Sequence, residues 1–215
     1  MTASPDIRGF CPPQFAPVRE TFEANFREGL ELGARFALAI EGEIVVDLTG
    51  GWADRDETAP FGPETLTAVF STTKAMAALM LARLVDQGRL TYEEPLADLW
   101  PEFAAAGKES LAIGEILSHQ AGLPGFAEPM AASDWFDHDQ IAGKLAAMAP
   151  MWPPGTAAGC HPVTFGYLAE EIFRRADGRT IGQALRDDLA QSFGLDLWIG
   201  LPEAEHARCA DVRRP

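Results

Sequence analysis

The spacing of apolar residues near the start of the chain predicts one helix followed by a β-hairpin. Large apolar residues recur every four positions within 18–32, which is typical of one face of a helix. The segments 35–40 and 43–48 are short and apolar, and Glu41 and Gly42 separate them, a pattern typical of two strands joined by a tight turn. Because a two-stranded hairpin is not stable alone, we expect its partner strands to come from outside this sequence.

The rest of the chain carries mainly helical patterns. The segment that follows Ser71 is apolar on all sides as far as about Gln87, which predicts a helix buried in a core. Thr180 and Gln183 form the capping-box pattern that opens a helix. Shorter helices are expected over 95–101, 113–118, 139–148, 164–176 and 180–193.

Composition and charge narrow the class of protein. With 215 residues, of which 47% are hydrophobic, the chain is long and apolar enough to fold around a core. Its net charge of -15 is repelled by nucleic acids and by anionic membrane surfaces, so we expect neither as a partner. No stretch reaches the roughly 18 apolar residues that span a membrane.

The cysteines and the first residues of the chain bear on its compartment. Cys11, Cys160 and Cys209 are widely spaced and include no Cys-x-x-Cys pair, which is typical of free thiols in a reducing compartment and argues against a zinc site. The first residues show neither the basic start nor the apolar run of a secretory signal. A cytoplasmic location is therefore the expectation.

The most specific chemical signal is a Ser-x-x-Lys tetrapeptide, Ser71 to Lys74, at the start of the apolar helix. Residues three apart on a helix are neighbours on one face, so the two side chains can touch. The helix start and the apolar surroundings favour a neutral amine, and a neutral lysine beside a serine is a general base beside a nucleophile. In the alternative interpretation, Ser71 caps the helix and Lys74 extends into water.

Three further segments resemble landmarks of one enzyme family. The sequence Ile-Leu-Ser-His-Gln-Ala-Gly-Leu-Pro at 116–124 resembles the Leu-Leu-Ser-His-Thr-Ser-Gly-Leu-Pro signature of serine β-lactamase-like esterases. Residues 50–54 after the hairpin and Trp-Pro-Pro-Gly at 152–155 resemble two other landmarks of the same enzymes. The segments occur in the order expected for these enzymes and together cover almost the whole chain. The chain thus resembles the family VIII carboxylesterases, relatives of class C β-lactamases and D,D-peptidases.

The resemblance implies an α+β, β-lactamase/transpeptidase-like fold. A helical domain lies beside an antiparallel sheet flanked by helices, and the C-terminal strands of that sheet are missing from this chain. We expect 1–66 to form the N-terminal part of the sheet domain and 67–200 to form the helical domain, with the Ser71 helix at its start. Residues 201–215 are expected to return toward the absent remainder of the sheet domain.

The resemblance also implies roles for individual residues. Ser71 is the acyl-accepting nucleophile, Lys74 is its base, and the Ser71 backbone N–H is one half of an oxyanion hole. The implied reaction is hydrolysis of a small-molecule carboxylic ester through an acyl-enzyme, without metal or organic cofactor. Phe126, Trp135 and Trp152 are candidates for an apolar substrate pocket, with ordinary core packing as the alternative. Two other functions stay open: hydrolysis of β-lactams or D-alanyl peptides, and an inactive binding or assembly protein of the same fold.

The sequence departs from the family at two points. The family has a tyrosine after the Trp-x-Pro-Gly turn, whose hydroxyl relays a proton with the lysine, but here the alignment puts Cys160 there. A thiol is shorter than a phenol, so slow turnover is expected; a Cys160–His161 nucleophilic pair is the alternative. Family members also continue beyond the position of Pro215, so the chain is expected to be a fragment, or an oligomer or a second chain completes the sheet.

The remaining conspicuous side chains are expected to have structural roles. His119 should hold its turn by hydrogen bonds, and His138 and His206 should be solvated because their surroundings in the sequence are polar. Tyr167 lies inside the helix expected over 164–176 and should pack there rather than replace the family's tyrosine.

Overall fold

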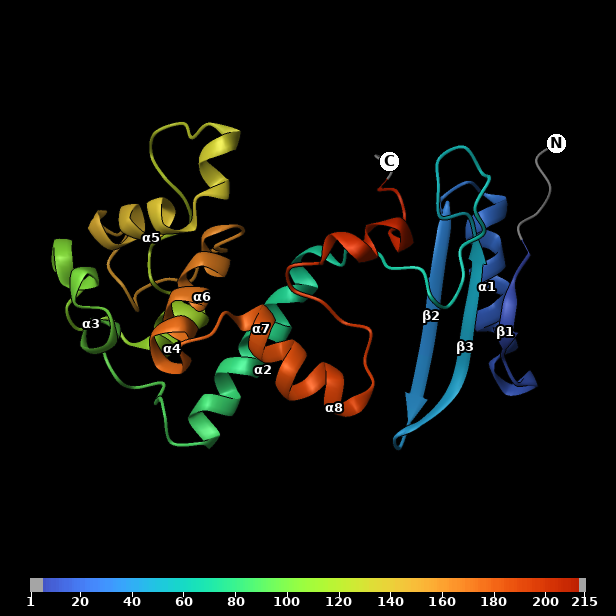
Figure 1. Cartoon of the computed structure of the whole chain (residues 1–215), viewed down its shortest axis with the longest axis horizontal. Coiled ribbons are helices and arrows are strands. Elements are labelled where there is room, and N and C mark those ends of the chain that lie inside the picture. Colours follow the sequence, from blue (N-terminus) through green and yellow to red (C-terminus); the bar gives the residue numbers. More distant parts are fainter. Residues whose placement is uncertain (1–5, 213–215) are drawn as a thin grey trace. The chain divides into compact units, whose positions relative to one another are not determined.

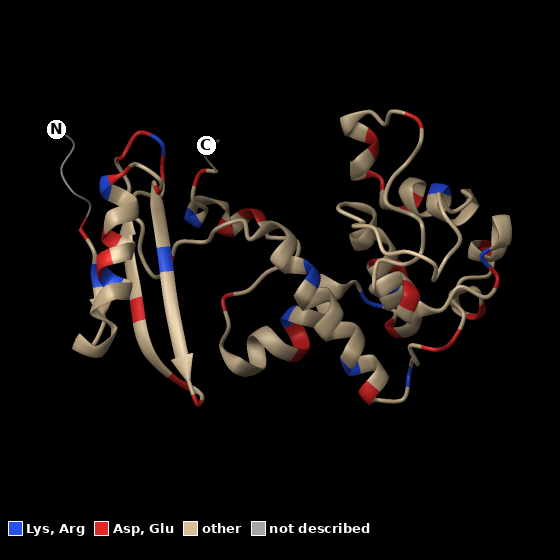
Figure 2. Ribbon diagram, turned by 180° about the vertical axis from the view of Figure 1, so that it is seen from behind, with Lys and Arg blue, Asp and Glu red and all other residues tan. Residues whose placement is uncertain are grey.

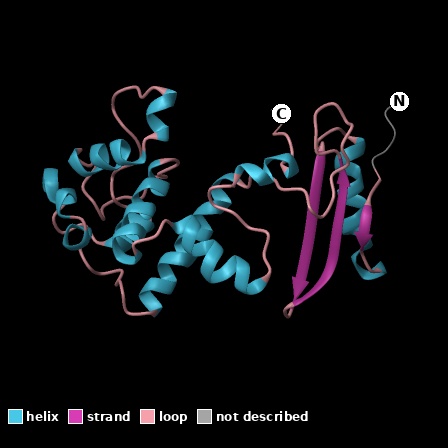
Figure 3. Ribbon diagram, viewed as in Figure 1, coloured by secondary structure: helices cyan, strands magenta, loops and turns pink. Residues whose placement is uncertain are grey.

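The computed structural model describes residues 6–212, which form two compact units. The segments before Phe70 and after Gly200 make up the first unit, and Phe70–Gly200 makes up the second. Each unit has its own hydrophobic core. All the strands of the described residues belong to the first unit, whereas the second is built of helices and loops (Figure 3).

The sheet of the first unit contains three antiparallel strands in the order β1-β3-β2. Strand β2 (Gly33–Ile40) and strand β3 (Glu43–Gly51) form the predicted hairpin. The turn between them has positive φ at both central residues, 53° at Glu41 and 86° at Gly42, which suits the right-handed twist of paired strands. Strand β1 (Arg8–Phe10) was not predicted, because three residues carry no recognisable alternation.

Helix α1 (Ala16–Arg27) covers one face of this sheet (Figure 1). Its buried Phe22 packs with Val46 and Leu48 of β3, which are fully buried. Burying each of these side chains contributes about 1.5–3 kcal/mol. The helix ends five residues earlier than the predicted 18–32. The prediction that no partner strand of the hairpin lies in this sequence is wrong in part, because β1 pairs with β3. That further strands from outside this sequence complete the sheet stays a prediction.

The second unit forms around α2 (Thr73–Asp86) and α6 (Thr164–Asp177), which lie against each other. Met80 and Leu84 of α2 belong to the same core as Leu168 and Ile172 of α6. The prediction that α2 is buried on all sides is wrong, because its Leu79 side chain is 45% exposed. The other helices of this unit are α3 (Leu96–Leu99), α4 (Ile113–Leu117), α5 (His138–Ala147), α7 (Ile181–Leu185) and α8 (Gln191–Phe193).

The last helical stretch confirms one prediction and corrects another. Thr180 caps α7 by accepting the backbone N–H of Gln183, and the Gln183 side chain accepts the Thr180 N–H, as the capping-box pattern predicted. The helix expected over 180–193 is divided, however, because a π-helical turn (Arg186–Ala190) separates α7 from α8. Short 3-10 segments that were not predicted occupy Pro13–Phe15, Phe70–Thr72, Pro101–Gly107, Ala132–Phe136 and Glu203–Arg208.

Acidic residues outnumber basic ones along the ribbon (Figure 2), and several arginines form ion pairs with them. In the second unit, Arg179 donates to Asp177 at 2.6 Å and to Asp188 at 2.9 Å, while Arg89 donates to Asp177 at 2.7 Å. The hydrogen bond from Arg179 lowers the pKa of Asp177 to about 2. This network joins the end of α2 to the segment between α6 and α8. Between residues 6 and 212, no helix has the length and apolar character needed to cross a membrane.

Candidate functional site

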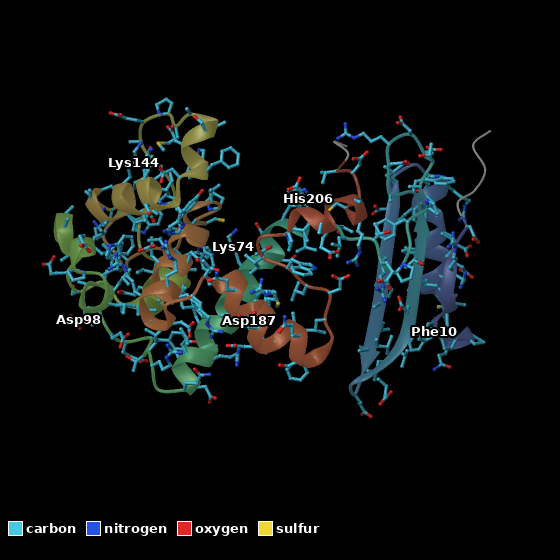
Figure 4. The ribbon with its side chains drawn as sticks, in the orientation of Figure 1. Phe10, Lys74, Asp98, Lys144, Asp187 and His206 are labelled. Atoms are coloured by element: carbon cyan, nitrogen blue, oxygen red, sulfur yellow. The ribbon has the colours of Figure 1, made fainter. Side chains whose placement is uncertain are left out.

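The structure brings Ser71 and Lys74 together at the start of α2. Ser71 lies in the 3-10 turn that precedes the helix, and Lys74 lies in the first helical turn. Figure 4 labels Lys74 among the side chains of the second unit. Its Nζ donates to Ser71 Oγ at 3.1 Å and to the Pro162 carbonyl at 2.9 Å. The N-cap residue is Thr72, so Ser71 does not cap this helix, and Lys74 is half-buried rather than extended into water.

The backbone turns sharply just before Ser71. Phe70 has a φ of +45°, a left-handed conformation that is uncommon for a bulky residue, and its side chain is 71% exposed. Such a conformation costs on the order of 1–3 kcal/mol and is found preferentially at functional sites. The sequence contains no signal for it, because phenylalanine is not a residue that favours this region.

The Pro162 carbonyl that Lys74 contacts belongs to the segment 159–164, which also carries Cys160. Cys160 is an exposed free thiol two residues before Pro162, and Cys11 and Cys209 are free as well, as predicted. Tyr167 does not take the place of the family's tyrosine. Its hydroxyl donates to the Trp135 carbonyl and its ring packs against Trp135, with 6.0 Å between ring centroids.

Two histidines join this segment to the loop after α4. His161 is fully buried, and its Nε2 accepts the backbone N–H of Leu123 at 2.9 Å. The Nδ1 atoms of His119 and His161 are 3.3 Å apart, and His119 Nδ1 also accepts the His161 backbone N–H at 3.2 Å. The prediction that His119 holds its turn by hydrogen bonds is confirmed. Its partner 42 residues away was not predicted, because contacts at that separation leave no local pattern.

Burial lowers the pKa of both imidazoles below the ordinary value of 6.5, since desolvation disfavours the charged form. For His119, the positive charge of Lys74 lowers the pKa further. For His161, a hydrogen bond that the ring donates to the Gly159 backbone raises the pKa, but desolvation outweighs it. Both rings are therefore neutral at pH 7.

Two glycines allow the loop after α4 and the segment 159–164 each to pack closely against Trp152. Gly122 has a φ of +71°, and a Cβ there would lie 2.6 Å from the Trp152 carbonyl oxygen. A Cβ at Gly159 would lie 2.6 Å from the Trp152 ring. Only glycine fits at either position without displacing its neighbours. The Trp152 ring thus packs against Gly159 of the segment. Its Nε1 donates to the Ala157 carbonyl at 2.9 Å.

The candidate substrate-binding residues divide into two groups. Phe126 and Trp135 lie together, with 5.7 Å between ring centroids, and line a cavity of about 320 Å³. Val163 also lines this cavity and directly follows Pro162, whose carbonyl contacts Lys74. Trp152 is not among the lining residues. The full lining is Pro124, Gly125, Phe126, Glu128, Pro129, Met130, Trp135 and Val163.

One group of side chains among the described residues has atoms close enough together to hold a metal ion: His138, Asp139 and Glu171, within 4.8 Å. Arg174 Nη1 already lies 3.3 Å from both carboxylates, and Arg175 Nε lies 3.0 Å from Glu171. These guanidinium groups neutralise the carboxylates, so the cluster is an ion-pair network between α5 and α6. The prediction that His138 is solvated is wrong, because its Nε2 lies 2.9 Å from Glu171 Oε1. His206 is exposed, as predicted.

Comparisons with known proteins show which family this chain is similar to. A family model described as beta-lactamase matches residues 22–215. The chain is similar in structure to a penicillin-binding protein homologue from Caulobacter crescentus, with 64% identity and a TM-score of 0.95, over 98% of this chain and 57% of the homologue. A family VIII carboxylesterase has 46% identity and a TM-score of 0.89, over 95% of this chain and 57% of the other.

A relative found by sequence also belongs to the esterases and beta-lactamases by its description. The esterase/beta-lactamase LipL of Mycobacterium tuberculosis is 35% identical over 97% of this chain and 49% of its own length. The chain therefore spans about half the length of the relatives it matches. On the family match over most of its length, this chain belongs to the beta-lactamase family.

Proposed function

We propose that the chain carries the nucleophile and base of a serine hydrolase that cleaves small carboxylic esters. The observation that carries this proposal is the 3.1 Å hydrogen bond between Lys74 Nζ and Ser71 Oγ at the start of α2. A hydroxyl within hydrogen-bond reach of an amine is the arrangement required for an activated serine nucleophile. Relatives described as esterases support the choice of substrate class.

The geometry supports an acyl-enzyme mechanism with Lys74 as its base. As Ser71 Oγ bonds to the ester carbonyl carbon, Lys74 in its neutral form takes the hydroxyl proton. The Pro162 carbonyl holds one Lys74 N–H, which directs the amine toward Ser71. The Ser71 backbone N–H, at the positive end of α2, donates to the negative oxygen of the tetrahedral intermediate. The proton then passes from Lys74 to the departing alcohol, and water later hydrolyses the acyl-enzyme.

The cavity beside Phe126 and Trp135 supports an apolar group on the substrate. Val163, which lines this cavity, directly follows Pro162, whose carbonyl accepts a hydrogen bond from Lys74. The aromatic walls favour an alkyl or aryl group, and Glu128 at the same cavity disfavours a substrate that carries a carboxylate. We propose neutral esters with a short apolar acyl or alcohol group.

Labelling with a fluorophosphonate tests the nucleophile directly. Wild-type protein should gain one adduct on the peptide that contains Ser71, and Ser71→Ala should gain none. The matched control is Thr72→Ala, which removes the neighbouring exposed hydroxyl and should label like wild type. An adduct on Cys160 with Ser71 unmodified would contradict the proposal and favour a cysteine nucleophile.

A second candidate substrate class is the β-lactams. The relatives described as an esterase/beta-lactamase and as a penicillin-binding protein homologue favour it. Acylation by a chromogenic cephalosporin, compared with a p-nitrophenyl ester, separates the two classes. Cys160 at the position of the family's tyrosine supports the inactive alternative, and absence of both acylation reactions in folded protein would establish it.

A further inference from the structure

We infer that the His119–His161 pair is a positioning device for Lys74 and that it makes the reactivity of Ser71 fail in acid by loosening the segment 159–164. This inference rests on the proposed function of Ser71 and Lys74. It concerns a part of the site that touches neither the substrate nor the reacting atoms. Both histidines act through the backbone carbonyl of Pro162.

The hydrogen bonds assign a tautomer to each ring. His161 Nε2 faces the N–H of Leu123, so this nitrogen carries no proton and Nδ1 carries it instead. His119 Nδ1 faces two donors, the His161 backbone N–H and His161 Nδ1, so its own proton is on Nε2. Three of the four ring nitrogens are thereby committed to hydrogen bonds, and each bond that a ring nitrogen accepts requires that nitrogen to be unprotonated.

The same bonds fix the segment that holds Lys74. The loop and the segment are joined by Gly159 N–H to the His119 carbonyl at 3.0 Å and by Thr164 Oγ to the Leu123 carbonyl at 2.6 Å, besides the bonds of the two rings. Pro162 lies in the middle of these attachments, and proline has no N–H with which to anchor itself. Its carbonyl is thus aimed at Lys74 by its neighbours on both sides.

A proton added to either ring breaks this arrangement. On His161 Nε2 it would face the Leu123 N–H, and on His119 Nδ1 it would face the His161 N–H, so two donors would meet in each case. Aromatic side chains pack against both rings. The centroid of the Phe165 ring of α6 is 5.2 Å from that of His119, and the centroid of the Trp152 ring is 6.1 Å from that of His161.

The charged groups around the pair do not favour protonation. Lys74 of α2 is the cation that acts on His119, and the two rings act on each other. The carboxylate of α4, Glu115, is engaged with the Ala112 N–H at the start of that helix. The exposed Cys160 lies on the segment itself. Protonation of either ring is therefore disfavoured, and it removes the acceptor of at least one hydrogen bond.

Non-titrating isosteres test the inference. His161→Gln keeps an acceptor near the position of Nε2, and His119→Asn keeps one near the position of Nδ1, but neither can be protonated in this range. Rates of Ser71 labelling by a fluorophosphonate are measured from pH 8 to pH 5 for wild type, both variants and the double variant. Lys74 acts as the base in all four proteins. Any fall in labelling rate that its own protonation causes at lower pH is therefore the same in each.

The wild-type rate should fall about tenfold further than the double-variant rate between pH 7 and pH 5, and the rates at pH 8 should agree within about threefold. Superimposable profiles would overturn the inference. If His161→Gln does not fold, the His119→Asn profile decides in the same way.

Nitrogen NMR of the imidazoles supplies a readout that does not require labelling. Wild-type protein at pH 7 should show His161 protonated at Nδ1 and His119 at Nε2, and the Leu123 amide should lose its protection from hydrogen exchange as His161 becomes protonated. Opposite tautomers, or a Leu123 amide that is indifferent to pH, would overturn the inference. Absence of Ser71 labelling at every pH would refute the proposed function. The NMR result would still show whether protonation of the histidine pair loosens the segment 159–164.

Discussion

Lys74 and Lys108 each lie near an aromatic ring of the second unit, but they differ in burial and in what their amines contact. Lys74 Nζ lies 5.9 Å from the centre of the Phe165 ring, and Lys108 Nζ lies 5.1 Å from the centre of the Phe103 ring. The Lys108 side chain is fully buried, and its Nζ donates to the carbonyls of Ala105, Ala146 and Met148. The partners of Lys74 are one carbonyl and one hydroxyl.

The helix ends beside the two amines explain the difference. Ala146 lies in the last turn of α5 and Met148 is its C-cap, so Lys108 meets the negative end of a helix, where a cation is favoured. Lys74 lies in the first turn of α2, where the helix dipole disfavours a cation. All three N–H groups of Lys108 have carbonyl acceptors, which leaves no position for chemistry. Burial alone therefore does not mark a lysine as a base; its partners do.

Replacement of Lys74 by arginine, compared with replacement of Lys108 by methionine, should break the comparison most strongly. A guanidinium does not give up its proton near neutral pH, so Lys74→Arg should reduce the rate of Ser71 acylation by about 10²–10⁴-fold. Lys108→Met, chosen because arginine does not fit the buried site, should leave the acylation rate of the folded fraction within about threefold of wild type. Both rates are measured by single-turnover labelling. Retention of most activity by Lys74→Arg would mean that Lys74 is only a structural cation.

Replacement of Cys160 by tyrosine should sharpen the comparison by giving Lys74 another polar partner. The phenol of the family reaches farther than the exposed thiol of Cys160, and a positioned acid–base group is worth at least about 10²-fold in rate. In a protein extended to the length of its relatives, Cys160→Tyr should therefore raise the rate of ester turnover by about that factor. In the 215-residue chain it should do little, because the Ser71 backbone N–H is only one half of the oxyanion hole. Cys160→Phe is the control, because it adds the ring without the hydroxyl. Equal gains in both variants would show that packing, not proton transfer, limits the wild type.

The two halves of the candidate site differ in how far the sequence could predict them. Ser71 and Lys74 are three residues apart on one helix, so helical geometry alone predicts their contact, and the hairpin and the capping box of Thr180 are local patterns of the same kind. Two of the three carbonyl partners of Lys108, Ala146 and Met148, lie about 40 residues beyond it, as does His161 relative to His119. Contacts at such separations depend on how helices pack, and a single sequence does not record that.

Local exceptions also escaped prediction for physical reasons. Phe70 adopts a left-handed conformation that its residue type disfavours, so tertiary contacts must hold it there. Strand β1 has three residues and acquires its identity only by pairing with β3. The solvated state expected for His138 was wrong because its polar neighbours in the sequence proved less important than Glu171 on another helix.

Loss of the Lys108 amine should affect stability where loss of the Lys74 amine does not. In Lys108→Met the apolar stem remains, but the three carbonyls lose their buried donor, which should lower the free energy of unfolding by about 2–4 kcal/mol. Lys74→Met should change it by less than about 1 kcal/mol, because the Lys74 partners are near the surface. Urea denaturation of the three proteins measures both effects. Equal destabilisation by the two substitutions would remove the distinction between a structural and a chemical lysine.

The smallest expected effect is a change in how stability depends on pH. Burial lowers the pKa of Lys108 in the folded protein below the ordinary value of 10.5 that applies when the chain is unfolded. Between these two pKa values the unfolded state binds more protons, so the contribution of Lys108 to the free energy of unfolding rises with pH there. Below the folded pKa its contribution is constant. The rise is at most about 1.4 kcal/mol per pH unit.

Unfolding of wild type and Lys108→Met in urea, compared from neutral pH to about pH 10, isolates this contribution. The difference in unfolding free energy between the two proteins should grow as pH approaches 10.5, because only wild type has the pH-dependent contribution of Lys108. Lys144→Met, which removes an exposed lysine of α5, controls for the loss of one positive charge and should show no such growth. A difference that shrinks with rising pH would mean that the three carbonyls hold the Lys108 ammonium more strongly than burial disfavours it. In that case charge stabilisation at the end of α5, rather than desolvation, would dominate the behaviour of this lysine.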